Sequence, residues 1–249
     1  MEYISIIICS RTQTISNDLF DNIANTIGCE YELIIIDNSL NQYSIFEAYN
    51  LGIKKSIGEL LVFLHDDIII HTQDWGLVLK NIFESDSEIG LIGVAGAKSK
   101  TKMPSAWWNC AEEQKVINII QHFPNKEKKK LNLGFDNNCN IEVAVVDGVF
   151  MAIRKDNRIK FNVNFKGFHK YDLNLSFETF KYGYKIIVTN NILIEHLSRG
   201  TINKSWYLST IEIHEIYKKY LPILIDFNKT NKNLNSLEFS NGEIGRAHV

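Results

Sequence analysis

The chain has 249 residues, of which 45% are hydrophobic and 22% charged, and its formal net charge is −2. This length suffices for one large α/β domain or two small ones with a full core. The near-neutral charge gives no basic footprint for nucleic acid, and no apolar stretch reaches the length of a membrane span. The four cysteines form no CxxC motif and the start has no basic region. We therefore expect reduced thiols, no signal peptide and a cytoplasmic location.

Apolar runs and helical patterns alternate through the first part of the chain. Runs at 4–9, 31–36 and 60–64 predict buried strands, and helical patterns cover 17–27 and 45–56. A strand–helix–strand–helix–strand order indicates parallel strands joined by right-handed crossovers. The first half is therefore predicted to be a sheet of the nucleotide-binding type.

The same criteria predict further elements up to about residue 220. Helices are expected over 75–83, 168–182 and 205–220, and strands over 89–95, 141–146, 149–153, 186–188 and 192–194. The lysine-rich run at 126–130 is interpreted as a solvated loop.

We expect one domain over residues 1–225 and a poorly ordered tail over 226–249, because the tail is rich in Asn and Lys. Its last seven residues resemble the translation of a common sequencing-adapter oligonucleotide. We interpret them as a sequencing artefact, with the natural gene continuing beyond.

The predicted strand at 60–64 ends in the triplet His65-Asp66-Asp67. Carboxylates and an imidazole are ligands for a divalent cation, and ligands of open α/β sheets bind outside the carboxyl ends of the strands. The triplet therefore indicates a metal-assisted reaction on a phosphorylated substrate. Side chains alternate along a strand, so Asp66 and Asp67 are expected to differ in role, and His65 shares the face of Asp67. The alternatives are a helix-capping turn for the acids and packing for His65.

Polar residues also follow the first two predicted strands. Ser10 and Arg11 can contact the base or phosphates of a nucleotide, and Asp37 can accept the N–H of a uracil ring, which favours a uridine nucleotide such as UDP. A helix N-cap is the alternative for Asp37. Arg199 is expected to close over a diphosphate, with an exposed loop charge as its alternative. The absence of GxGxxG and GKS/T motifs argues against a dehydrogenase or a P-loop protein.

Residues 48–67 resemble family 2 glycosyltransferases of the GT-A fold. Asn50 and Gly52 match the Asn-x-Gly helix of that family, Gly58-Glu59 follow, and the next strand ends in an acidic motif of the DxD type. Other segments resemble further motifs of the family and occur in the same order along the chain. They are residues 5–11, 36–39, 146–150, 167–172, 183–186 and 194–196. The resemblance covers roughly residues 3–200. It implies a single-domain α/β protein with a Rossmann-like, mixed and mostly parallel sheet flanked by helices.

This resemblance implies a role for each acidic residue. Asp67 would hold Mn²⁺ or Mg²⁺, Asp66 would contact the ribose, and Asp172 would be the general base. His196 would return to the metal or the diphosphate, as a late histidine often does in such enzymes. A structural His196 and a helix-start Asp172 are the alternatives. The implied activity is inverting transfer of a sugar from a nucleotide donor to a hydroxyl acceptor.

The acceptor side is expected to involve four residues. Trp107 and Trp108 can stack on a sugar ring, or can pack in the core. Asp147 and Gly148 would line the acceptor pocket, or would form a hairpin turn. The implied acceptor is a glycan, a lipid-linked molecule or a protein. The implied setting is bacterial surface glycan synthesis, in the cytoplasm or at the inner face of the membrane.

The chain departs from the family pattern at three positions. His65 replaces the first acid of the triplet, Tyr171 replaces the Glu before Asp172, and Asn174 replaces a further acid. The Gln-x-x-Arg-Trp motif is absent, which argues against processive synthesis. Two other classes stay open. One is a nucleotidyltransferase, whose Gly-rich loop has a poor match here, and the other is a degenerate sugar-nucleotide-binding module.

Overall fold

The computed structural model describes residues 3–123, 127–198 and 200–225, and contains five α-helices within those ranges. The helices are α1 (Asn17–Thr26), α2 (Ile45–Lys55), α3 (Trp75–Ser85), α4 (Tyr171–Lys181) and α5 (Lys204–Tyr217). The strands are β1 (Ile4–Ser10), β2 (Tyr31–Asp37), β3 (Leu60–Leu64), β4 (Ile68–Ile70), β5 (Ile89–Gly93), β6 (Ala95–Ala97), β7 (Ser99–Lys100), β8 (Lys115–His122), β9 (Lys128–Leu133), β10 (Asn140–Glu142), β11 (Val145–Val146), β12 (Phe150–Arg154), β13 (Lys185–Thr189), β14 (Ile194–His196) and β15 (Ile223–Leu224). The predicted tail and Arg199 lie outside the described residues.

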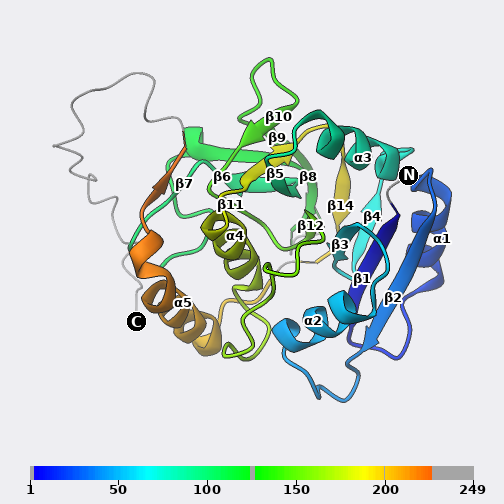
Figure 1. The fold of residues 1–249 in the computed structure, drawn as a ribbon, viewed down its shortest axis with the longest axis horizontal. Coiled ribbons are helices and arrows are strands. Elements are labelled where there is room, and N and C mark those ends of the chain that lie inside the picture. Colours follow the sequence, from blue (N-terminus) through cyan, green and yellow to red (C-terminus); the bar gives the residue numbers. More distant parts are fainter. Residues whose placement is uncertain (1–2, 124–126, 199, 226–249) are drawn as a thin grey trace.

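The main sheet has seven strands in the order β10-β13-β5-β12-β3-β1-β2 (Figure 1). β1 pairs in parallel with both β2 and β3, as the alternating pattern predicted. β12 runs antiparallel between β3 and β5, which makes the sheet mixed. The predicted α/β class, with a mixed sheet and flanking helices, is confirmed.

The chain also forms a second sheet, of six strands. Its strand order is β11-β6-β8-β14-β4, with β9 paired to β8. The prediction of a loop at 126–130 is wrong for the described residues 128–130, because they begin β9 and pair antiparallel with β8. Exposed lysines suit this outer strand, since charges on an edge strand oppose further strand pairing.

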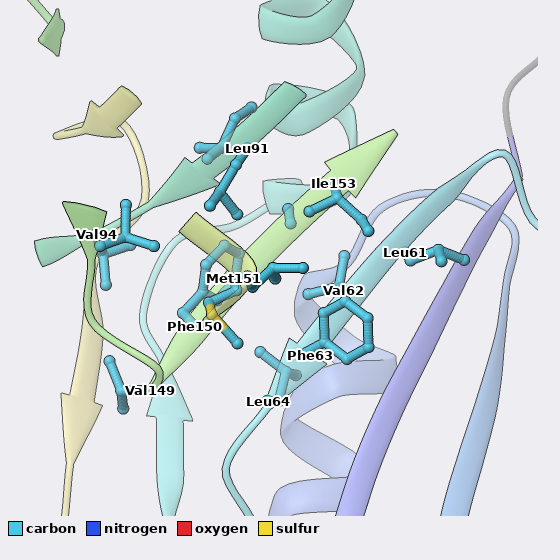
Figure 2. Close-up of a cluster of buried hydrophobic side chains, with 14 of the residues drawn as sticks. Leu61, Val62, Phe63, Leu64, Leu91, Val94, Val149, Phe150, Met151 and Ile153 are labelled. Carbon is cyan, nitrogen blue, oxygen red and sulfur yellow. The ribbon is translucent and has the colours of Figure 1, made fainter. Parts of the chain in front are cut away.

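The core of the main sheet is formed by β3, β5 and β12. Every residue of β3 is buried, because both faces of the sheet are covered. Figure 2 shows side chains from these three strands packed together, with Phe63, Phe150 and Met151 among them. This packing fixes the end of β3, where the His65-Asp66-Asp67 triplet begins.

The chain passes from one sheet to the other at two places near the predicted site residues. β11 pairs with β6 in the second sheet, and β12 pairs with β3 and β5 in the first. Asp147-Gly148 therefore carries the chain from one sheet to the other, and the alternative of a hairpin turn is wrong. β4 also belongs to the second sheet, so the chain changes sheets again directly after Asp67. Within the described residues, no helix has the length and apolar character needed to cross a membrane.

Candidate active site

Three side chains converge at the carboxyl end of β3. Nδ1 of His65 lies 3.6 Å from Oδ1 of Asp67, Nε2 of His196 lies 3.5 Å from the same oxygen, and the two nitrogens are 3.4 Å apart. The exposed fractions of these side chains are 30%, 19% and 12% respectively. The group is therefore partly shielded while remaining open to solvent.

Strand register explains why residues so distant in sequence meet here. β14 pairs antiparallel with β4, and this register sets His196 opposite Ile68, the residue after Asp67. The backbone N–H of Leu197 also donates to the carbonyl oxygen of Asp67 at 3.0 Å. His65 follows β3 and Asp67 precedes β4, and the bend at 66–67 between these strands brings the two side chains within 3.6 Å of each other.

The size of this triangle fits a metal ion. Three atoms separated by 3.4–3.6 Å are each about 2.0 Å from the centre of their triangle, which is close to the roughly 2.0–2.2 Å at which imidazole nitrogen and carboxylate oxygen bind Zn²⁺. His65, Asp67 and His196 are also the described side chains whose geometry could hold an ion. The structure thus brings Asp67 and His196, the two predicted metal ligands, together with His65.

Electrostatics favour an ionised Asp67. Burial alone would raise the pKa of this carboxyl, but hydrogen bonds from His196, His65 and Ser198 outweigh burial and hold it well below its ordinary value. The carboxylate is therefore available as a metal ligand throughout the neutral range.

β14 is anchored on its other face by Glu195. This buried carboxylate accepts hydrogen bonds from His122 at 2.5 Å and from His71 at 2.8 Å, which lower its pKa to about 2. His71 follows β4 and His122 ends β8, so the contacts tie together the strands on either side of β14. His196, which projects to the opposite face, is thereby fixed in position.

Asp66 turns away from the triangle towards the end of β1. It accepts hydrogen bonds from the backbone N–H of Arg11 at 3.3 Å, from its guanidinium at 3.4 Å, and from the Ser10 hydroxyl at 3.5 Å. Asp37 ends the neighbouring strand β2 in register with Ser10. A hydrogen bond from Ser39 lowers the pKa of Asp37. Four residues predicted to bind the nucleotide-sugar donor therefore lie along one edge of the sheet. They are Ser10, Arg11, Asp37 and Asp66.

Asp172 lies in the first turn of α4 and is half-buried. Burial, reinforced by the negative charge of Asp147, raises the pKa of Asp172 to about 6. Asp147 itself accepts hydrogen bonds from the indole N–H of Trp107 at 2.7 Å and from the backbone of Val149 at 2.9 Å. The Asp147 carboxylate is therefore near enough to act electrostatically on Asp172, and the two groups have different hydrogen-bond partners.

The two tryptophans occupy different environments. Trp107 is 7% exposed and its indole donates to Asp147, whereas Trp108 is 39% exposed and its ring lies against that of Trp206, with centroids 6.1 Å apart. Gly148 makes room for Tyr171, because a Cβ at Gly148 would lie 2.4 Å from the Tyr171 hydroxyl oxygen.

Sequence reasoning overlooked two residues of this region. The Tyr171 hydroxyl contacts Nε2 of His65, and Oε1 of Gln121 lies 3.1 Å from Nδ1 of His196. A signal existed for Tyr171, which directly precedes Asp172 and replaces an expected acid. Gln121 carried no signal, because its position depends on the parallel pairing of β8 with β14.

The mixed sheet with flanking helices is the architecture of the GT-A fold. The model of the family described as "Glycosyltransferase like family" matches residues 5–226, and the chain belongs to that family. No curated protein matches the chain.

Solved structures share the fold at low sequence identity. The structure of GalNAc-T7 with UDP, GalNAc and Mn²⁺ has a TM-score of 0.58 and 12% identity, over 88% of this chain and 49% of that one. S. aureus TarS 1–349 with UDP-GlcNAc has a TM-score of 0.55 and 12% identity, over 87% and 66%. The mannosyltransferase PcManGT from Pyrobaculum calidifontis, with GDP-Man and Mn²⁺, has a TM-score of 0.54 and 12% identity, over 87% and 64%. The chain spans about half to two thirds of the length of these structures.

Proposed function

We propose that this protein is an inverting, metal-dependent glycosyltransferase that moves a sugar from a nucleotide diphosphate donor to a hydroxyl acceptor. The observation that carries the proposal is the convergence of His65, Asp67 and His196 at the end of β3. Membership of the glycosyltransferase-like family supports the reaction class.

The donor is proposed to lie along the carboxyl ends of β1, β2 and β3. Arg11 and Ser10 would contact its phosphates or base, and Asp66, which already accepts from both, would face the ribose. Asp37 at the end of β2 would accept the uracil N–H, so we propose a UDP-sugar. Two of the similar structures contain UDP or a UDP-sugar, and a third contains GDP-Man. Arg199 is retained as a proposed diphosphate contact.

The metal ligands would be Nδ1 of His65, Oδ1 of Asp67 and Nε2 of His196. A divalent ion there would stabilise the charge of the departing nucleoside diphosphate. Two imidazoles and one carboxylate suit Mn²⁺ better than Mg²⁺, because Mg²⁺ prefers oxygen ligands. We therefore propose Mn²⁺ as the preferred ion.

Asp172 is proposed to take the proton from the acceptor hydroxyl as that oxygen attacks the anomeric carbon. A pKa of about 6 leaves Asp172 ionised at neutral pH yet more basic than an ordinary aspartate. Asp147 and Gly148 would line the acceptor side, and exposed Trp108 would stack on an acceptor ring. Trp107 would act there through Asp147.

The proposed acceptors are a glycan, a lipid-linked molecule or a protein, in bacterial surface glycan synthesis. The described cysteines are free thiols, and burial raises the pKa of Cys9 to about 11. These unpaired thiols support a reducing compartment, the cytoplasm, where the protein would act in solution or at the inner face of the membrane.

The test is release of UDP from a panel of UDP-sugars, measured with Mn²⁺, with Mg²⁺ and with EDTA. We expect turnover with Mn²⁺ that EDTA abolishes and that Asp67→Asn lowers at least a hundredfold. Asp21→Asn, which alters an exposed carboxylate on α1, is the matched control. Metal-dependent UDP binding without turnover would instead indicate a binding module. Neither binding nor turnover with any nucleotide sugar would refute the proposal.

A further inference from the structure

The hydroxyl of Tyr171 contacts Nε2 of His65 across a separation of 106 residues. Tyr171 opens α4, and His65 follows β3. Each replaces an acid of the family pattern, so two departures that appeared independent in the sequence are in direct contact. This contact lies on the side of the imidazole opposite the nitrogen that faces Asp67 and His196.

The second histidine shows how such a contact can select a tautomer. The amide of Gln121 donates through Nε2 to the carbonyl oxygens of Ser198 at 2.7 Å and His122 at 3.0 Å, which fixes its orientation. Its Oε1 can only accept, so Nδ1 of His196 keeps a proton and donates to it. Nε2 of His196, which faces Asp67, is therefore the nitrogen that can give up its proton to bind a cation.

The same logic applies to His65. Its Nδ1 is the nitrogen in the triangle with Asp67 and His196, so binding a cation there requires the proton to sit on Nε2. Nε2–H then donates to the Tyr171 oxygen. A phenol hydroxyl has lone pairs as well as a proton, so the Tyr171 oxygen can accept this hydrogen bond.

We propose that Tyr171 is a positioning residue, whose hydroxyl fixes the tautomer and the orientation of His65 as a metal ligand. This inference rests on the metal site of the proposed function. Hydrogen bonds from metal-bound histidines to a neighbouring acceptor commonly set both the ring orientation and the affinity.

The surroundings of Tyr171 hold its hydroxyl in place. Its ring packs against buried Tyr49, with centroids 5.6 Å apart in an edge-on arrangement. On another side it lies against Gly148, where any Cβ would collide with it. Asp172 follows directly in the chain, so the ligand-orienting hydroxyl and the proposed base share the first turn of α4. Movement of this turn would therefore disturb both groups together.

The experiment is a double-mutant cycle on Mn²⁺ affinity, measured by isothermal titration calorimetry on the full chain without a donor. Tyr171→Phe keeps the ring and removes the hydroxyl, and should weaken Mn²⁺ binding about 10- to 100-fold. Tyr49→Phe, a buried tyrosine in the same ring cluster, is the matched control and should leave the affinity unchanged. In a His65→Ala background, Tyr171→Phe should have no further effect, because its partner is gone.

A spectroscopic readout separates positioning from a general structural role. Co²⁺ bound to the wild-type protein should give visible absorption bands that shift in Tyr171→Phe and stay unchanged in Tyr49→Phe. Wild-type Mn²⁺ affinity in Tyr171→Phe, an equal loss in the His65→Ala background, or no Mn²⁺ binding by the wild type would each overturn the inference. Affinities that follow the cycle without any sugar transfer would refute the proposed reaction and leave the role of Tyr171 standing.

Discussion

Asp172→Asn should raise stability and lower activity at the same time. The substitution keeps the size of the side chain and its acceptor for the Leu173 N–H, at 2.8 Å in the wild type, and removes only the charge. As the proposed base, Asp172 supplies proton transfer, for which a loss of about 10²- to 10⁴-fold in kcat is typical.

The stability gain follows from the raised pKa. Burial and the charge of Asp147 raise the pKa of Asp172 from 3.8 to about 6, a shift of roughly two units. At about 1.4 kcal/mol per unit, the ionised carboxylate lowers the free energy of unfolding by up to about 3 kcal/mol. The folded state holds the proton more tightly, so this loss develops as the pH rises from about 4 to about 6 and is complete above that range.

The assay is urea unfolding of wild type and Asp172→Asn at pH 4 and pH 8, with UDP release measured in parallel. We expect the two proteins to differ little at pH 4 and the variant to be more stable at pH 8. The wild-type transfer rate should also fall about tenfold per pH unit below pH 6. A variant no more stable than wild type at pH 8, or one with unchanged transfer, would refute the reasoning. Asp21→Asn serves as the control for loss of one negative charge.

Three further substitutions test other parts of the structure. Burial lowers the pKa of Lys100 to about 7, so Lys100→Met should raise the free energy of unfolding below pH 7, by up to about 5 kcal/mol. This gain should shrink as the pH rises towards 10, and a gain that is equal in denaturant titrations at pH 6 and pH 9 would count against it. Trp107→Phe removes the N–H that Asp147 accepts and should cost about 1–3 kcal/mol in urea unfolding, so a cost near zero would argue against this brace. Gly148→Ala introduces a Cβ against the Tyr171 hydroxyl and should weaken Mn²⁺ binding in calorimetric titrations, whereas wild-type affinity would show that this contact is not needed.

Local patterns were sufficient to predict the first half of the fold. β1, β2 and β3 are continuous apolar runs separated by amphipathic helices, and such runs indicate buried parallel strands without long-range information. The second sheet was not predictable in this way. β4 and β14 have three residues each, and β9 is a mostly exposed lysine-rich strand, so each is defined by its partner and not by its own composition.

The residues of the candidate site were also predictable only in part from local patterns. Asp66 and Asp67 follow a clearly predicted strand, and their side chains have different partners, as predicted, although a bend rather than an extended strand separates their directions. His196 could be connected to Asp67 only through a family resemblance, because the pairing of β14 with β4 leaves no trace in composition. The contact between Tyr171 and His65 depends on how α4 packs against β11 and β13, and no local pattern encodes that packing.

The central claim is that one metal ion is held by His65, Asp67 and His196 while a nucleoside diphosphate lies beside Asp66 and Arg11. The most direct measurement is a crystal structure of the protein with UDP and Mn²⁺. The account predicts anomalous density for manganese within bonding distance of Nδ1 of His65, Oδ1 of Asp67 and Nε2 of His196, with diphosphate oxygens completing the coordination. Manganese bound elsewhere, or UDP bound with the three side chains in place and no metal between them, would contradict it.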